Sequence, residues 1–125
     1  MFLKGQQNLN DVAISAQIDD APRSTFLIVV CLAPFVEEVL FRGYVFGNLR
    51  DHSRWAAYAA SCLLFALLHV WQFAVVEQNL QYFLLMLQYL VPGLVLAWTY
   101  ERSGTLWSSV MLHAFVNAMA IGRFL

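Results

Sequence analysis

Three long stretches of this chain contain no Lys, Arg, Asp or Glu. They are residues 55–76, 78–100 and 103–122, with lengths of 22, 23 and 20 residues. A helix rises about 1.5 Å per residue and the hydrocarbon core of a bilayer is about 30 Å thick, so each stretch is long enough to cross a membrane. Only 12% of all residues are charged, against about 25% in soluble domains. The stretches therefore predict transmembrane helices.

A fourth apolar run comes first in the chain, and short polar connections join the four runs. Short connections force neighbouring helices to run antiparallel, so the predicted fold class is an all-α, up-down-up-down bundle in a multi-pass integral membrane protein. The four spans are expected at about 24–49, 55–76, 79–100 and 104–122. Residues 1–23 are polar and lack the features of a signal peptide, so they are expected to form an extramembrane segment ahead of a core at 24–123.

Charge and cysteine content narrow the possible partners. The formal net charge is −1, which gives no reason to expect a nucleic acid, and the lipid bilayer is the partner that the composition implies. Cys31 and Cys62 lie in apolar runs, where we expect small hydrophobic side chains rather than a disulfide or a metal site. Three basic residues fall on each side of the bundle, so the positive-inside rule leaves the orientation open.

Two acids and an arginine interrupt the first predicted span. One charge at bilayer depth costs about 2.5–3.5 kcal/mol, so Glu37, Glu38 and Arg42 need an explanation. Glu38 and Arg42 are four residues apart with the acid first, which favours an ion pair on one helix face. Glu37 points about 100° away from Glu38 and is left without that partner. A free carboxylate near a histidine can serve as a general base, whereas the ion pair can be purely structural.

Three further polar residues lie at matching depths in other spans. His69 is on the second span, and His113 and Asn117 share one face of the fourth because they are four residues apart. Once helix tilt is allowed for, these three and Glu37 are expected to face one buried cavity. Pro34, one turn before Glu37, removes a backbone donor, and such breaks are tolerated where a helix lines a cavity. As interhelical contacts such polar residues contribute only about 0.6 kcal/mol, and a structural role stays open for each.

The same residues form three short motifs, each on its own span. They are Glu-Glu-x-x-x-Arg at 37–42, Phe-x-x-x-His at 65–69 and His-x-x-x-Asn at 113–117. In this order they resemble the signature motifs of the CPBP intramembrane proteases, also called the CAAX protease and bacteriocin-processing family, or Abi family, which includes type II CAAX prenyl endopeptidases. The resemblance covers residues 21–123.

This resemblance implies an all-helical membrane endopeptidase. Glu37 would activate a water, and His69 would hold that water or share its proton. His113 and Asn117 would stabilise the oxyanion on the scissile carbonyl, a contribution of about 2.7–4 kcal/mol per donor in other enzymes. The neighbouring ion pair would orient the site. The substrate would be a peptide or protein in or at the membrane. A prenylated CAAX tail, a peptide pheromone, a bacteriocin leader and a membrane anchor all stay open.

The resemblance leaves the use of a metal open. Glu37, His69 and His113 are the candidate ligands for a zinc ion, and names in the family often say metalloprotease. The chain has no His-Glu-x-x-His helix, and Asn117 would be a poor zinc ligand but a good oxyanion donor. We therefore favour hydrolysis by a glutamate-activated water with no cofactor, and zinc stays as the alternative.

Two explanations other than a protease also stay open. A catalytically silent family member could act as a membrane immunity or scaffold protein and keep the polar cluster for stability. A small transporter or proton relay could use the buried acids, although a transporter would more naturally show inverted repeats. Family members usually carry further helices before the first motif, so a minimal core or a piece of a longer protein is expected. The side-chain tips of the four cavity residues are expected to lie close enough to share one water, and Glu38 is expected to turn toward Arg42 and away from that point. Gln81 and Gln88 on the third span are expected to stay outside the cluster.

Overall fold

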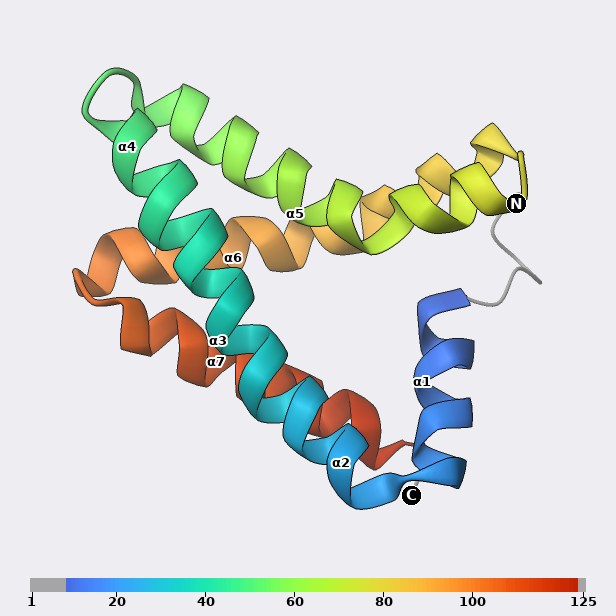
Figure 1. Cartoon of the computed structure of the whole chain (residues 1–125). Helices are drawn as coiled ribbons and strands as arrows, with labels where there is room; N and C mark the ends of the chain where they lie inside the picture. The colour runs from blue at the N-terminus through green and yellow to red at the C-terminus, as the bar shows by residue number, and fades with distance from the viewer. Residues whose placement is uncertain (1–8, 124–125) are drawn as a thin grey trace.

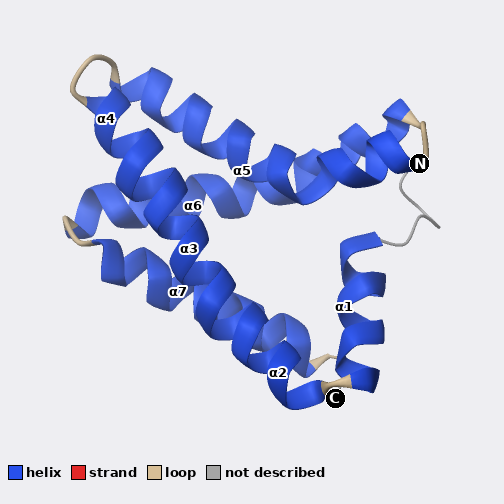
Figure 2. Ribbon diagram, in the orientation of Figure 1, coloured by secondary structure: helices blue, strands red, loops and turns tan. Residues whose placement is uncertain are grey.

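The computed structural model describes residues 9–123, and this part of the chain is helical with no strand (Figures 1 and 2). Three helical segments are long and apolar enough to cross a membrane, and a shorter apolar helix follows them. They are Pro22–Arg50, Arg54–Trp71, Leu80–Ser103 and Leu106–Gly122. The all-α class and the four-span, multi-pass arrangement predicted from the sequence are confirmed.

The first span is one continuous rod made of five successive pieces. They are α2 (Pro22–Phe26), η1 (Leu27–Leu32), α3 (Ala33–Glu38), η2 (Val39–Phe46) and α4 (Gly47–Arg50). The pieces η1 and η2 are π-helical, so their hydrogen bonds reach five residues back instead of four. The break expected at Pro34 is therefore a π-helical turn just before the proline. The short helix α3, which carries both acids, lies between the two wider turns.

The four spans form two helix pairs that diverge from each other. Helix α5 (Arg54–Val76) lies beside α6 (Leu87–Ser103), and a short 3₁₀-helix, η3 (Leu80–Met86), connects them. Helix α7 (Leu106–Gly122) lies along η1 and α3 of the first span. Figure 1 shows these two pairs spreading apart toward the side where α1 (Leu9–Asp20) crosses between them. The space between the pairs holds the site described below.

Local sequence signals explain where the last two helices end and begin. Helix α6 ends at Gly104, whose φ of 72° lies in the left-handed region that glycine adopts without strain. Helix α7 begins after Thr105, whose hydroxyl accepts a hydrogen bond from the Trp107 N–H, as an N-terminal cap does. The tight connection makes α6 and α7 neighbours and fixes where α7 meets the first span.

The buried core consists of small clusters along the bundle. Phe46, Ala57, Cys62 and Ala97 pack together at the end near α4. Phe41, Phe65 and Leu96 pack in the middle. Many other large apolar side chains, such as Leu63, Trp98 and Phe115, are exposed on the outer surface. An apolar exterior is expected of helices whose solvent is lipid rather than water.

The N-terminal segment contains a helix for which the sequence analysis made no prediction. Residues 1–8 lie outside the described part of the chain, and residues 9–20 form helix α1, which the sequence analysis did not predict. Ile18 of α1 is buried against Val30 and Ile121. The Thr25 hydroxyl donates to the carbonyls of Gln17 and Ala21, at 2.9 and 2.8 Å, and so ties α1 to α2. The extramembrane location of residues 1–23 stays a prediction.

Candidate active site

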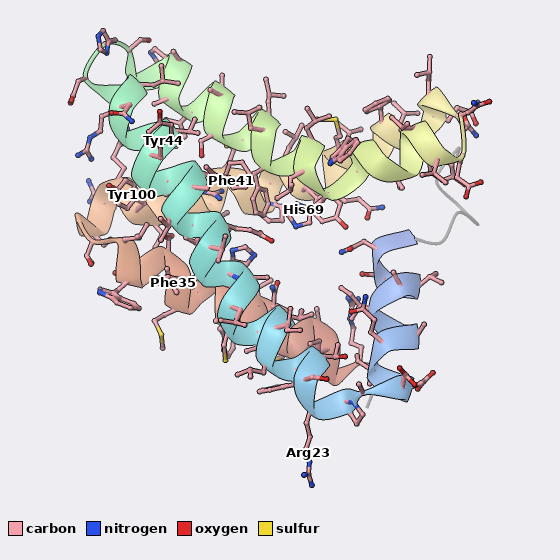
Figure 3. All side chains as sticks on the ribbon, in the orientation of Figure 1. Arg23, Phe35, Phe41, Tyr44, His69 and Tyr100 are labelled. Atoms are coloured by element: carbon pink, nitrogen blue, oxygen red, sulfur yellow. The ribbon has the colours of Figure 1, made fainter. Side chains whose placement is uncertain are left out.

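Three of the side chains expected in the site meet between the helix pairs. Glu37 comes from α3, His69 from α5 and His113 from α7. The Glu37 Oε2 atom lies 3.7 Å from His69 Nε2 and 3.6 Å from His113 Nε2. Figure 3 shows the labelled His69 side chain on the side of α5 that faces α3. The convergence across three spans that the motifs predicted is present in the structure.

Hydrogen bonds to the far side of each imidazole set its orientation. The Nδ1 atom of His69 lies 2.8 Å from the Phe65 carbonyl oxygen, four residues back on α5. A carbonyl can only accept, so His69 Nδ1 carries the proton and donates it. The Nδ1 atom of His113 likewise lies 2.7 Å from Glu38 Oε1. In the neutral state both histidines therefore turn an unprotonated Nε2 toward Glu37.

The point between Glu37 Oε2 and the two Nε2 atoms is surrounded by hydrogen-bond acceptors when both histidines are neutral. A molecule that binds there must donate hydrogen bonds to them. Glu37 Oε2 is buried and has no hydrogen-bond partner among the described residues. Its distances to the two Nε2 atoms are too long for direct hydrogen bonds, and polar gaps of this size are commonly bridged by water. A water at this point would find three acceptors around it. The geometry thus suits holding a water and taking protons from it.

The Glu38–Arg42 pair forms as its spacing predicted, and both side chains are fully buried. Arg42 Nη1 lies 3.2 Å from Glu38 Oε1, and Arg42 Nη2 donates to the Gly93 carbonyl at 2.8 Å. The expectation that Glu38 turns away from the site was wrong, because the same Oε1 also accepts from His113. The two neighbouring acids approach opposite nitrogens of one imidazole. Glu38 therefore links the ion pair to the site.

Asn117 lines the same cavity but is held differently from the other three. Its Nδ2 donates to the Val29 carbonyl of the first span at 2.8 Å. The expected sharing of one point by four side-chain tips is seen for three of them. Only the second amide hydrogen of Asn117 is left to face a substrate.

Aromatic packing around the site involves two side chains that the sequence analysis gave no role. Phe65, present in the second motif, contacts the rings of both histidines, and the Arg42 guanidinium lies 4.7 Å from its ring centroid. Tyr89 of α6 stacks on His69, with ring centroids 4.5 Å apart. No sequence signal distinguished Tyr89 from the other aromatic residues of the spans. Gln81 and Gln88 are both exposed, and Gln88 also contributes to the cavity wall, so neither joins the cluster of Glu37 and the two histidines.

Gly93 is a second position that sequence reasoning missed, although a glycine within a span is a known sign of close helix packing. A Cβ atom added there would lie 3.3 Å from Phe65 Cδ1 and 3.5 Å from the Cα of Cys62. The missing side chain lets α6 approach α5, and it brings the Gly93 carbonyl to Arg42.

Gly93→Ala should therefore destabilise the bundle by about 1–3 kcal/mol through overpacking. The measurement is the thermal midpoint of the purified protein in detergent. Gly122→Ala is the matched control, because an added Cβ there meets no described heavy atom within 4 Å. An unchanged midpoint for Gly93→Ala would show that the α5–α6 contact is loose.

A cavity of about 1230 Å³ opens from this cluster. Glu37, His69 and His113 lie on its wall, and most of its other lining is apolar, with side chains such as Val95 and Leu112. Helix α1 contributes part of the wall at the open side of the helix pairs. The cavity is large enough for an extended peptide segment.

The candidate zinc ligands fit a metal centre only in part. Each histidine is anchored through Nδ1, which is the usual arrangement for a histidine that binds metal through Nε2. However, within residues 9–123 no group of three or more His, Cys, Asp or Glu side chains has the geometry of a metal site. No step is therefore derived through a metal, and the chelator experiment described below tests whether one is used.

Comparison with known proteins places the chain in a family. A family model described as "Type II CAAX prenyl endopeptidase Rce1-like" matches residues 20–119, which include all three motifs. The chain belongs to the Rce1-like family. The resemblance found from the motifs is thus confirmed.

Two curated relatives of this Rce1-like chain come from Lactococcus lactis subsp. lactis (strain IL1403). The UPF0177 protein YxdF is 30% identical over 90 residues, covering 72% of this chain and 44% of the relative. The UPF0177 protein YbdI is 29% identical over 99 residues, covering 77% of this chain and 46% of the relative. The chain thus spans less than half the length of each. No solved structure matches it.

Proposed function

We propose that this Rce1-like chain is an intramembrane endopeptidase, which hydrolyses a peptide bond in or near the membrane with a glutamate-activated water. The observation that carries the proposal is the buried, unpartnered Oε2 of Glu37 among the described residues, 3.6 and 3.7 Å from two histidine Nε2 atoms. A structural carboxylate would be expected to use its oxygens in direct hydrogen bonds. This oxygen instead lies beside two imidazole nitrogens at distances longer than a direct hydrogen bond.

In the proposed mechanism Glu37 acts as the general base. It accepts a proton from a water that His69 helps to hold, and the water oxygen forms a bond to the scissile carbonyl carbon. The C–N bond then breaks, and the proton on Glu37 passes to the leaving amine. Water is consumed, and a carboxylic acid and an amine are produced, so the step needs no other reactant.

The oxyanion formed in this step needs a proton donor close by. We assign this role to His113 in its protonated form, which would present Nε2–H toward the carbonyl oxygen while Nδ1–H stays bonded to Glu38. A carboxylate on the far nitrogen stabilises an imidazolium, which is why the Glu38 contact supports this assignment. Asn117 is bonded to the Val29 carbonyl, and the proposed mechanism gives it no contact with the oxyanion.

The family description suggests the first substrate to test, which is a peptide ending in a prenylated CAAX sequence. The assay compares this peptide with the same peptide lacking the prenyl group, using purified protein in lipid vesicles. Cleavage of either peptide supports the proposed reaction, and the difference between them reports whether the lipid is recognised. A folded protein that cleaves neither peptide, nor a panel of membrane-anchored peptides, would favour the alternative of an immunity or scaffold protein.

Cleavage should persist after treatment with a strong metal chelator, because we propose that Glu37 and the two histidines activate the water directly. The measurement is the initial cleavage rate before treatment, after treatment, and after adding zinc back. Loss of the rate with chelator and its return with zinc would contradict the metal-independent mechanism. A chelator effect that zinc does not reverse would point to damage of the protein, which the folded fraction measured in the same samples would reveal.

A further inference from the structure

One carbonyl of the first span, that of Val29, lacks both regular helical donors, the N–H groups four and five residues further along the chain. In η1 the Ala33 N–H donates to the Ile28 carbonyl, five residues back. In the same register the next donor, residue 34, would serve the Val29 carbonyl, but Pro34 has no N–H. In an ordinary α-helix the donor to Val29 would be Ala33, and that N–H is already bonded to Ile28. A carbonyl left unpaired away from water is costly, so a donor is required from elsewhere.

Asn117 supplies that donor from another span. Its Nδ2 lies 2.8 Å from the Val29 oxygen, which is a good hydrogen-bond length. The bond lies beside the packed cluster of Ile18, Val30 and Ile121, against which Val29 also packs, so it is partly buried. The side-chain amide of Asn117 thus donates to Val29 the hydrogen bond that Pro34, which has no N–H, cannot donate.

The same face of α7 holds the first span at a second point. His113, one turn before Asn117, bonds to Glu38 at 2.7 Å. The two hydrogen bonds connect α7 to the first span on both sides of Pro34, at Val29 before the proline and at Glu38 after it. Glu37 lies between them, next to the second bond. Its position relative to His113 therefore depends on both contacts.

We propose that Asn117 is a positioning residue, which replaces the missing N–H of Pro34 and thereby sets the register of the helix segment that carries Glu37. Its importance for catalysis rests on the proposed function of Glu37, but the bond to Val29 does not. The role differs from that of an oxyanion donor in one testable way. A backbone N–H restored at position 34 should make Asn117 dispensable, whereas an oxyanion donor would be needed regardless of residue 34.

The test is a double-mutant cycle of Asn117→Ala and Pro34→Ala, read as the thermal midpoint in detergent, which does not depend on enzyme activity. Asn117→Ala alone should lower the midpoint by roughly 3–8 °C, the effect expected for one lost hydrogen bond. In the Pro34→Ala chain the same substitution should have little effect, because residue 34 can now donate to the first span. If Asn117→Ala alone fails to fold, folding of the double variant gives the same answer. Equal losses in both chains, or failure of both to fold, would overturn the proposal.

Pro92→Ala is the matched control, because Pro92 is also a proline inside a helix but lies in α6. Combined with Asn117→Ala, it should give no rescue. Cleavage per folded molecule is the second readout, and it should return in the Pro34→Ala, Asn117→Ala double variant. A recovered midpoint with cleavage still lost would overturn the positioning role and assign Asn117 to the oxyanion. Absence of cleavage in the unmodified chain would instead count against the proposed function and leave the midpoint test intact.

Discussion

Glu37→Gln is expected to reduce cleavage by at least about a hundredfold, because the amide keeps the size of the side chain and loses its ability to accept a proton from water. The protein should still fold, since Glu37 Oε2 has no hydrogen bond within residues 9–123 that the change would break. The measurements are the initial cleavage rate and the folded fraction by size-exclusion chromatography. A rate close to that of the unmodified protein would rule out Glu37 as the base.

A matched control for this change is available on the rim of the same cavity. Glu77 is an exposed carboxylate that lines the cavity away from the two histidines. Glu77→Gln removes the same charge with the same change of atoms, and it should leave the cleavage rate unchanged. Equal losses in the two variants would mean that the overall charge of the cavity matters, and not the position of Glu37.

Arg42→Ala is expected to reduce the yield of folded protein sharply, with a smaller effect on the activity of each folded molecule. The substitution leaves Glu38 buried without its ion-pair partner and the Gly93 carbonyl without the Arg42 donor. Removing one side of a buried pair costs on the order of 3–5 kcal/mol. The folded yield after membrane extraction measures this effect. A well-folded but fully inactive Arg42→Ala would place Arg42 at the reacting atoms.

Two further variants test whether the loss in Arg42→Ala arises because the remaining charge is buried, and not because an ion pair is lost. Arg42→Met combined with Glu38→Gln removes both charges and should recover much of the folded yield, since uncharged replacements of a buried pair are often neutral. Arg54 pairs with Glu101 at 2.7 Å but is 60% exposed. Arg54→Ala should therefore change the folded yield very little, because water and salt screen an exposed ion pair. A loss as large as that of Arg42→Ala would contradict the role given to burial.

The long-range features that the sequence could predict follow from strong and simple signals. Charge-free stretches of more than 18 residues fix the spans, because few other structures accommodate them. The spacing of Glu38 and Arg42 on one helix predicts their ion pair. The three motifs, placed at similar depths on three spans, predict the meeting of Glu37 with the two histidines, although the catalytic roles of these residues stay proposals.

The features that could not be predicted depend on contacts that no local pattern encodes. The bond from His113 to Glu38 depends on how α7 is turned against the first span. The bond from Asn117 to Val29 depends on a π-helical turn, which the sequence announces only through Pro34. Tyr89 stacks on His69, and Gly93 lets two helices approach closely, only because α6 lies against α5. Helix α1 has a weakly patterned sequence, and its helical state was missed for that reason.

The π-helical turn at Leu27–Leu32 has a consequence for how changes in chain length would act on this protein. Each residue added to or removed from a regular helix rotates everything beyond it by about 100° around the axis. A π-helical turn holds one extra residue without adding this rotation, so the directions in which side chains point before and after it can be set independently. The side chains of α2 can then keep facing their own surroundings while both neighbouring acids of α3 face inward. Deleting one residue from this turn should convert it into a regular α-helical turn and leave the segments on either side facing nearly as before. The same deletion from a regular turn at this place would rotate both acids by about 100° relative to α2.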